Sequence, residues 1–447
     1  MYRLYLALRY LLTRPINLLG VGGIALSVWA LVVVVSLFTG FIAVVEAHVH
    51  DASADISIGD LPPGSDGQAL VRELRTDPNV QAAAPRLLHH GLLHRQGHRP
   101  PPPPLLGRTA LHGGDQPFLF VLGVDAAAEA EATGFQRWLT DSAIPANLRV
   151  ADPQNPLTAP AGTTAVLVGL ERCRAEGWQR GDRLVLHSGR LVRSGDGQTT
   201  PVQVQLPLWL AGAYKTQHGG FDGNNVFVPR AALAEALFDG SATLVHEIAV
   251  RLTDPTDLAG SAERLQRTVQ RALDPGDGRG YGAVRTWRQK NQAFLHSVEH
   301  QRALLKIVLV VILVVAAFLM LATLSMMVTE KVADIGILTA LGGTPLGVTS
   351  VFLACGLCIT LVGLGFGMAL GTVTAVYLEE VRQALLWLFG IDLFPIEVYN
   401  LDRVPCRIDP WWLVQVAGMA LATGTVVSVL PALRAARHDP LVSLREA

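Results

Sequence analysis

Leu304–Pro345, LLKIVLVVILVVAAFLMLATLSMMVTEKVADIGILTALGGTP, is the stretch that decides the fold. Its central part, Ile307–Val328, holds no charged residue and exceeds the roughly 20 residues that a helix needs to cross a bilayer core. This run predicts a membrane span. The charged residues Glu330, Lys331 and Asp334 follow at once, before the sequence returns to apolar residues and a Gly-Gly pair. A short charged amphipathic helix between two spans is a suitable docking surface for a cytoplasmic partner.

The composition of the whole chain is that of a membrane protein. Its cysteines do not indicate a disulfide framework. It has 447 residues, 50% of them hydrophobic, and a formal net charge of -1, which gives no indication of a nucleic-acid partner. Its cysteines, Cys173, Cys355, Cys358 and Cys406, lack the spacing of a disulfide framework or a zinc site. Cys355 and Cys358 form a CxxC inside an apolar helix, where packing is the expected role.

The N-terminal region predicts another span, which is the first along the chain. Arg3, Arg9 and Arg14 alternate with Leu and Tyr at helical spacing, which is typical of an amphipathic helix on the cytoplasmic face. Leu18–Val45 is free of charge. It is too long for a signal-peptide core and lacks a convincing cleavage site after it, so we expect an uncleaved first span. The arginines before it place the N-terminus inside.

The region from Glu46 to Arg302 has the composition of a folded extramembrane domain. Short alternating runs predict strands, and amphipathic patches predict helices. Because long domains translocate largely regardless of charge, its arginines are compatible with an extracytoplasmic position. The expected strands are 164–168, 183–186 and 202–206, and the expected helices are 68–75, 231–238 and 258–273.

Two motifs in this domain favour a structural role over a binding role. Arg99–Pro104 reads RPPPPP, which predicts an extended polyproline spacer, with a peptide-binding role as the less favoured alternative. His90, His94 and His98 recur every four residues. The glycines and prolines nearby argue against a helix, and no carboxylate or cysteine completes a ligand set. We therefore expect a histidine-rich surface loop and no metal site.

The C-terminal third predicts two more spans. The third carries Gly363, Gly367 and Gly371 at the four-residue spacing that lets membrane helices pack closely. An outer loop with an apolar segment at 385–389, suited to an interfacial helix, leads to Trp411 and Trp412 at the outer edge of the fourth span. Arginines after that span hold the tail inside.

The fold class predicted is a membrane protein with four transmembrane α-helices, arranged one plus three around a large extracytoplasmic α+β domain. The expected segments are a cytoplasmic amphipathic helix 1–16, first span 17–45, outer domain 46–302, second span 303–329, coupling helix 330–345, third span 346–378, outer loop 379–409, fourth span 410–433 and cytoplasmic tail 434–447.

Several segments resemble the LolC/LolE branch of the FtsX/MacB family of ABC-transporter permeases. The most specific are the opening ALRYLLTRPINLLGVGGIALSVWALVVVVSLFTGF, the segment EKVADIGILTALGGTP and the ending LPALRAARHDPLVSLRE. Within the outer domain, FVLGVDAAAEAE, VGLERCRAEGWQRGDRLVL and AGAYKTQHGGFDGNNVFVP resemble the same permeases in the same order. The resemblance spans nearly the whole chain.

The resemblance implies a non-catalytic permease subunit in the cytoplasmic (inner) membrane. Such permeases pair with a second copy or a paralogue and bind a separate ATPase, which holds the ATP and Mg²⁺, whereas this chain is expected to bind no cofactor. It also implies a porter-like outer domain with an inserted β-rich part at about 156–229. The residues expected to couple to the ATPase are Glu330, Lys331, Asp334, Ile335, Leu338, Leu341 and Gly342.

The cargo implied by this branch is an acylated lipoprotein, passed to a soluble periplasmic carrier. A lipid-facing cargo cavity would be lined by Phe38, Phe41, Ile42, Val45, Leu304, Leu305 and Val308. A carrier-binding hairpin would lie at 187–205 and include Arg190, Arg193 and Pro201, although its sequence departs from the family's pattern and an ordinary solvated hairpin is an equal alternative.

The chain carries no ATPase signature of its own. A phosphate-binding loop needs Gly-Lys-Ser/Thr, and none of the four lysines follows a glycine. Two other functions stay open beside lipoprotein release. One is MacB-like export of peptides or amphiphiles, and the other is FtsX-like signalling to an extracytoplasmic hydrolase.

Overall fold

The chain forms two compact units in its computed structural model, which describes residues 16–62, 65–97, 118–193, 199–241, 243–273, 281–332, 334–335, 337, 344–390 and 404–436. One unit comprises Met1–Val44 and His296–Ala447, and the other comprises Val45–Leu295. The boundaries fall inside two long helices, α2 (Ile16–Asp51) and α11 (Gln292–Glu330). Each of these helices therefore contributes to both units.

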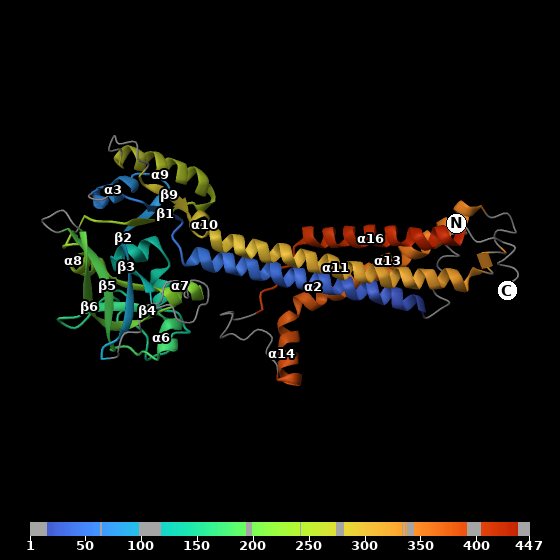
Figure 1. The fold of residues 1–447 in the computed structure, drawn as a ribbon, viewed down its shortest axis with the longest axis horizontal. Coiled ribbons are helices and arrows are strands. Elements are labelled where there is room, and N and C mark those ends of the chain that lie inside the picture. Colours follow the sequence, from blue (N-terminus) through green and yellow to red (C-terminus); the bar gives the residue numbers. More distant parts are fainter. Residues whose placement is uncertain are drawn as a thin grey trace. The chain divides into compact units, whose positions relative to one another are not determined.

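The first unit contains four helices that are long and apolar enough to cross a membrane. They are α2, α11, α13 (Pro345–Val376) and α16 (Pro410–Ala436), and Figure 1 shows them as elongated helices. One precedes the second unit in the sequence and three follow it, so the predicted one-plus-three arrangement is confirmed. The helices α2 and α11 extend beyond the expected spans 17–45 and 303–329 on the side of the second unit.

The membrane unit packs around a continuous apolar core. Ile24 and Val28 of α2, Leu324 of α11, Ile359 of α13 and Ala420 of α16 are all buried in it. In lipid, such contacts stabilise the unit through close packing, because moving a side chain from lipid to protein gains little hydrophobic free energy.

A shorter helix, α14 (Leu378–Phe389), follows α13 almost without interruption and turns away from it (Figure 1). It ends at Gly390, whose φ of 67° lies in the left-handed region that glycine adopts without steric cost. Trp387 and Phe389 near its end are strongly exposed. The apolar segment expected at 385–389 is thus the last part of a longer helix.

The second unit is built on nine strands in the order β3-β7-β4-β6-β5-β2-β8-β1-β9, and an additional β3–β2 pairing closes six of them into a ring. The ring contains β2, β3, β7, β4, β6 and β5. The strands are β1 (Ile56–Gly59), β2 (Val80–Arg95), β3 (Phe118–Val124), β4 (Thr164–Gly169), β5 (Arg183–Arg193), β6 (Thr199–Tyr214), β7 (Asn225–Pro229), β8 (Glu247–Leu252) and β9 (Ala283–Thr286).

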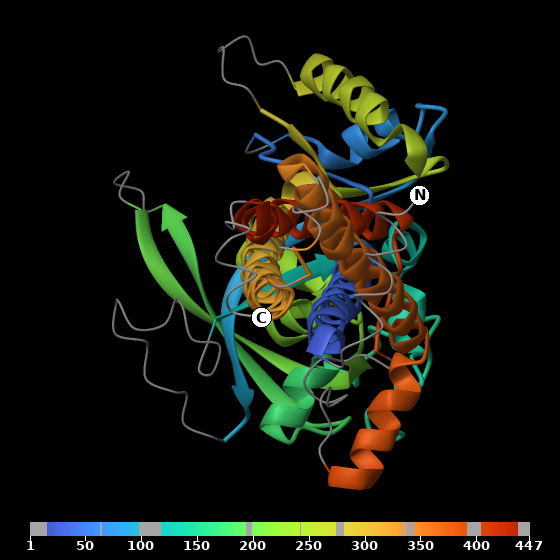
Figure 2. The same cartoon turned by 90° about the vertical axis from the view of Figure 1, so that its right-hand side faces the viewer.

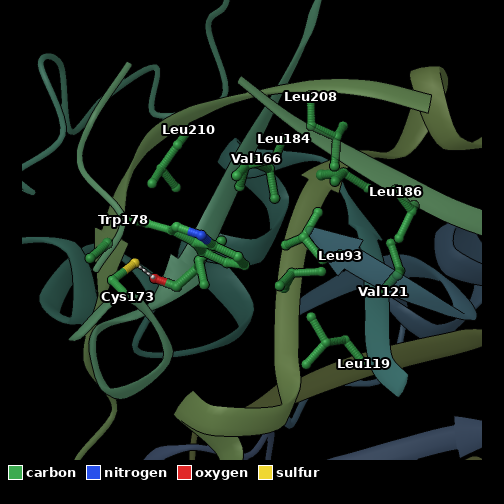
Figure 3. Packing of buried hydrophobic residues seen from close by; sticks show 14 of the residues in the cluster. Leu93, Leu119, Val121, Val166, Cys173, Trp178, Leu184, Leu186, Leu208 and Leu210 are labelled. Atoms are coloured by element: carbon green, nitrogen blue, oxygen red, sulfur yellow. Dashed lines mark hydrogen bonds between the residues drawn. The ribbon is translucent and has the colours of Figure 1, made fainter. Parts of the chain in front are cut away.

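Leucine and valine side chains from the ring strands form one core of this unit (Figure 3). Leu93, Val121 and Leu186 point toward one another, and Trp178 lies beside Cys173 at one end. The Cys173 thiol donates a weak hydrogen bond to the Val168 carbonyl over 3.9 Å, and burial raises the pKa of this thiol to about 12. Cys173 therefore has a packing role and is not a reactive thiolate.

A second core lies between the strands β2, β8, β1 and β9 and two helices, α3 (Gly67–Leu74) and α9 (Leu258–Leu273). Leu70, Leu74, Leu265 and Val269 supply the helical side of it. The long strand β2 belongs to both cores, because its first half pairs with β8 and its second half pairs with β3 and β5.

Short helices pack against the strands of this unit. Phe135, Trp138, Tyr214 and Phe227 form an aromatic cluster against the ring strands. The short helices are α4 (Ala126–Ala132), α5 (Phe135–Leu139), α6 (Leu170–Glu176), α7 (Gly219–Asn224), α8 (Arg230–Leu237), the 3-10 turn η1 (Pro255–Asp257) and α10 (Trp287–Lys290).

The structure changes one expectation about this domain and leaves another as a prediction. The core that contains the strands of 164–229 draws on residues from Leu87 to Leu244 and includes β2, and the inserted β-rich part at about 156–229 stays a prediction. His90 and His94 lie in strand β2 and not in a loop. Gly91 weakens a helix but is compatible with a strand. Pairing with β3 and β5 provides the backbone hydrogen bonds of this part of β2.

The expected strands and helices at 164–168, 183–186, 202–206, 68–75, 231–238 and 258–273 are all confirmed. Four further expectations fall outside the described residues. They are the amphipathic helix at 1–15, His98, the proline run 99–104 and the tail from 437 onward.

Candidate functional site

The segment after α11 is charged at its start and apolar after it. Lys331 lies in a turn, and its backbone N–H reaches the carbonyls of Met327 and Val328, both at 3.2 Å. Its ammonium pairs with the Asp334 carboxylate at 2.9 Å, and Glu330 is exposed. Leu338, Leu341 and Gly342, also expected in the coupling site, lie outside the described residues.

Ile335 and Ile337 differ in their surroundings. Ile335 is only 4% exposed and belongs to the core of the membrane unit, whereas Ile337 is 51% exposed. The expectation that Ile335 faces a partner protein is therefore wrong. On a helix, residues two positions apart point to different sides, so burying Ile335 leaves Ile337 at the surface. The sequence did not distinguish them, because both are equally apolar.

The outer part of α2 is crossed by the extended chain that precedes α16. The Arg407 N–H donates to the Ser36 carbonyl at 3.0 Å, and Ser36 is buried. A Cβ at Gly40 would lie 2.5 Å from the Pro405 carbonyl oxygen, so only glycine permits this close approach. We call residues 404–409 the strap.

The strap is joined to the start of α14 by a carboxylate. Glu379 accepts the Val404 N–H at 3.1 Å and the Arg382 guanidinium at 2.7 Å. The hydrogen bond from Arg382 holds the pKa of Glu379 well below its usual range, at about 2. The carboxylate is therefore charged at every physiological pH.

The residues expected to line a cargo cavity have mixed exposure. Phe38, Phe41, Ile42 and Val45 on α2 are half-buried. Leu304 and Val308 on α11 are 61% and 54% exposed, while the Leu305 side chain lies outside the described part of the chain.

The glycine stripe of α13 lies directly against α2. A Cβ at Gly363 would be 2.9 Å from the Ile24 Cβ, one at Gly367 2.6 Å from the Ala25 carbonyl oxygen, and one at Gly371 2.8 Å from the Val32 Cβ. Real Cβ atoms do not approach other atoms this closely, so the absence of side chains sets the distance between α2 and α13.

The hairpin of β5 and β6 extends beyond the other strands (Figure 2), with register pairs from Arg183↔Trp209 to Arg193↔Thr199. Arg190 does not project freely, because its guanidinium pairs with Asp239 after α8 at 2.6 Å. The side chains of Arg193 and Pro201 fall outside the described residues. The structure therefore accounts for Arg190 by a contact within the chain.

A buried charge network, which the sequence did not reveal, joins the two cores of the outer unit. Arg86 on β2 donates through Nε to Glu129 Oε2 at 2.9 Å, through Nη2 to Glu129 Oε1, and through Nη1 to Glu247 Oε1 at 2.9 Å. Lys290 Nζ donates to Glu247 Oε2 at 2.6 Å and to Ser57 Oγ at 3.3 Å. Arg86, Glu129 and Glu247 are almost fully buried.

The charges in this network compensate one another. Burial lowers the pKa of Arg86, but Glu129 and Glu247 raise it overall; burial raises the pKa of Glu247, but Lys290 and Arg86 lower it overall. Arg86 and Glu247 therefore stay charged at neutral pH. Lys290 is the last residue of α10, which lies immediately before α11. The network therefore connects the N-terminal end of α11 to strands β2 and β8.

The last turn of α2 and the start of α11 meet at the same place. The ring of His50 lies 4.8 Å from that of Trp287, and His50 Nε2 bonds to Asp55 Oδ1 at 2.9 Å. Burial raises the pKa of Asp55, but hydrogen bonds with His50 and from the Leu252 N–H lower it overall. Asn291 donates to Ser53 Oγ at 3.3 Å. The C-terminal end of α2 and the residues just before α11 are thus held together by one set of contacts.

Asp222, in the segment AGAYKTQHGGFDGNNVFVP, is fully buried. Its carboxylate accepts the Thr216 N–H at 3.1 Å and the Thr216 hydroxyl at 2.6 Å. Burial nevertheless raises the pKa of Asp222 to about 7. A Cβ at Gly169 would overlap the Asp222 backbone, which explains the glycine at that position.

We predict that this carboxyl makes stability depend on pH. Between about pH 4 and pH 7 the folded protein holds the Asp222 proton more tightly than the unfolded chain, so the free energy of unfolding falls as the pH rises. Thermal unfolding of the full chain should show this slope, and Asp222→Asn should flatten it. Glu235→Gln, at an exposed position, is the control. An unchanged slope in Asp222→Asn would contradict the prediction.

Comparison with known proteins gives the following similarities. Residues 306–440 match the family model FtsX-like permease C-terminal. The lipoprotein-releasing system transmembrane protein LolC of Neisseria meningitidis is 26% identical over 455 residues, covering 99% of this chain and 98% of the relative. LolC of Xylella fastidiosa is 25% identical and covers 96% of this chain and 94% of the relative. LolE of Haemophilus influenzae is 29% identical over 35% of this chain and 38% of the relative.

Among solved structures, the periplasmic region of MacB from Actinobacillus actinomycetemcomitans aligns with a TM-score of 0.31 and 9% identity, covering 54% of this chain and 91% of that one. The extracellular domain of the transporter YknZ from Gram-positive bacteria aligns with a TM-score of 0.28 and 11% identity, covering 52% of this chain and 99% of that one.

The four apolar helices, with a large domain between the first and the second, and the matched C-terminal region make the chain similar to FtsX-like permeases. Within this class, the similarity to LolC extends over nearly the full length of the chain. The chain is therefore similar to permeases of the LolC/LolE type over nearly its full length, and the resemblance predicted from its motifs is confirmed.

Proposed function

We propose that this permease subunit couples ATP hydrolysis by a separate ATPase to the release of lipoproteins from the cytoplasmic membrane. The observation that carries the proposal is the similarity to LolC, a lipoprotein-releasing system protein, along 99% of the chain. A second permease chain, either a copy or a paralogue, completes the transporter, and the ATPase binds ATP and Mg²⁺.

The topology that fits this function has both termini in the cytoplasm and the Val45–Leu295 unit outside the inner membrane. Arginines at the start of the chain and in the last turn of α16 support it, because cytoplasmic segments near spans carry an excess of positive charge. The exposed charged segment after α11 then faces the ATPase.

The work that the ATPase must supply is set by the cargo. Each methylene group leaving the bilayer costs about 0.8 kcal/mol, so a protein with several acyl chains does not leave spontaneously. Two features of this chain suit the transmission of that work. The helices α2 and α11 continue from the membrane unit into the outer unit, and the network around Arg86 and Lys290 connects the residues just before α11 to strands β2 and β8.

Depletion of the protein in its native cell tests the function directly. Acylated lipoproteins are quantified in each membrane fraction over time. Accumulation in the cytoplasmic membrane before any growth or division defect is the expected result. A normal lipoprotein distribution would refute lipoprotein release and direct attention to amphiphile export or hydrolase control. A periplasmic carrier, if engaged, should co-purify with released lipoprotein.

The coupling segment yields a separate prediction. Ile337→Glu should reduce co-purification of the ATPase at least tenfold, because a buried apolar contact would be replaced by a charge, while leaving the thermal stability of the permease unchanged. Ile337→Val is the conservative control. Ile335→Glu should instead destabilise the permease itself, because it buries a charge in the core. Equal ATPase binding by Ile337→Glu and the native chain would remove Ile337 from the docking surface.

A further inference from the structure

We propose that the strap, residues 404–409, ties the outer part of α2 to α14 and α16, so that α2, α13 and α16 move as one block. The outer half of α11 is then the segment that moves against this block. The inference concerns the motion of the membrane unit itself. It goes beyond the proposed function, because it does not depend on which cargo the permease handles.

The strap contacts the backbone of α2 directly. The Arg407 N–H donates to the carbonyl of Ser36 at 3.0 Å, in addition to the hydrogen bonds within the helix. A Cβ at Gly40 would lie 2.5 Å from the Pro405 carbonyl oxygen and 2.8 Å from the Cys406 Cα. Because no flexible side chain lies between the two backbones, α2 cannot slide or rotate beneath the strap without breaking this contact.

Both ends of the strap are anchored to other elements. At its start, the Val404 N–H donates to Glu379 of α14 at 3.1 Å, and Arg382 pairs with the same carboxylate at 2.7 Å. At its end, Asp409 accepts the Trp411 N–H of α16 at 2.9 Å, in the manner of a helix N-cap. The strap therefore connects α2 to the outer ends of α14 and α16, and α14 follows α13 directly.

Farther inward, the same helices pack closely against one another. The glycine stripe of α13 lies against α2, as described above. On the opposite seam, a Cβ at Gly356 of α13 would overlap Ser428 Oγ of α16, and a Cβ at Gly424 of α16 would overlap Thr360 Oγ1 of α13. Small residues at such seams let helix backbones approach closely. The strap thus closes, at the outer end, a block that is already packed at its centre.

The outer half of α11 has no comparable tie among the residues that the structure describes. The buried residues that α11 contributes to the membrane core begin at Leu313. Before that point Leu304, Ile307 and Val308 are each more than half exposed. Moving this part of α11 away from the block would break few contacts, whereas moving the outer part of α2 would break those of the strap. We therefore expect the outer ends to open between α11 and the block.

The native thiol of Cys406 reports whether the strap is attached. Cys406 is half-buried, and burial raises the pKa of its thiol. A released strap should react faster with a maleimide, because the thiolate is the reactive form. In the full chain carrying Cys358→Ala, which removes the other partly exposed cysteine, Gly40→Ala should accelerate labelling at least fivefold. Gly22→Ala is the control on the same helix, since its Cβ meets nothing within 4 Å. Equal labelling rates in the two variants would overturn the proposal.

A second pair of variants releases the other end of the strap, and it serves also if Gly40→Ala does not fold. Glu379→Ala removes the acceptor of the Val404 N–H, and Glu380→Ala changes the exposed neighbouring carboxylate. Labelling of Cys406 should accelerate at least threefold in Glu379→Ala and stay unchanged in Glu380→Ala. The same rate in both variants would show that the strap is not anchored through Glu379.

Distances between spin labels test whether the block moves as a unit. Pulsed electron paramagnetic resonance is applied to the full chain in nanodiscs, with the native cysteines replaced by alanine and labelled chains diluted with unlabelled ones. We expect the distance distribution of the pair Thr39 and Val414, which the strap connects, to be at most half as wide as that of Val308 and Val414. Gly40→Ala should widen only the first distribution. Equal widths in the native chain, or no effect of Gly40→Ala, would overturn the proposal.

Discussion

Replacing Arg86 by methionine should lower the free energy of unfolding by about 3–5 kcal/mol, the cost of removing one partner from a buried charge pair. Glu129 is completely buried and would lose the guanidinium that now contacts both of its carboxylate oxygens. Glu247 would keep Lys290 as its only cation among the described residues. Methionine fills much of the volume of arginine, so the loss would come from the uncompensated charge.

The measurement is thermal unfolding of the full permease in detergent. A loss of this size corresponds to a decrease in Tm on the order of 10 °C, since 1 kcal/mol shifts Tm by roughly 2–4 °C in domains of 150–250 residues. Arg285→Met is the matched control, because Arg285 pairs with Asp60 at 3.0 Å with both side chains largely exposed. Such pairs contribute about 0–1 kcal/mol. Similar Tm shifts in the two variants would show that burial of the network is not the source of its effect.

Gly367→Leu should separate α2 from α13 and reduce the proposed lipoprotein release at least tenfold. Any Cβ at position 367 meets the Ala25 carbonyl oxygen at 2.6 Å and the Val28 Cβ at 2.7 Å, so one of the helices must move. Overpacking of this kind typically costs about 1–3 kcal/mol. Release is measured as transfer of a labelled lipoprotein from reconstituted vesicles.

The control for this variant lies two residues away. Gly365 has open space around its Cβ position, so Gly365→Leu adds the same side chain to the same helix without a collision. It should retain native stability and release. If Gly365→Leu impairs release as strongly as Gly367→Leu, the effect would come from adding bulk to α13 and not from its packing against α2.

The spans and the small secondary elements could be predicted from the sequence because they depend on local patterns. An uncharged run such as Ile307–Val328 has one stable structure in a bilayer, since a helix satisfies all of its own backbone hydrogen bonds. The spacing of Gly363, Gly367 and Gly371 likewise indicated a packing face. The alternation of residues at 164–168 indicated a strand, because side chains in a strand point to opposite faces in turn.

The organisation of the outer domain depended on pairings between distant parts of the chain. Strand β2 pairs with β3, β5 and β8, and this closes the ring with strands that are distant in the sequence. His90 and His94 were assigned to a loop because local glycines weaken a helix. Partner strands from elsewhere in the chain decided that they belong to a sheet.

The sequence by itself determined that this protein has four spans and resembles permeases of the LolC/LolE type, because hydrophobic runs and family motifs are contiguous in the chain. Tertiary structure alone decided which of Ile335 and Ile337 is buried, that Arg86, Glu129, Glu247 and Lys290 form one network, and which residues of α2 the glycines of α13 contact. Burial, charge pairing and helix contacts are properties of several segments packed together, so no single stretch of sequence contains them.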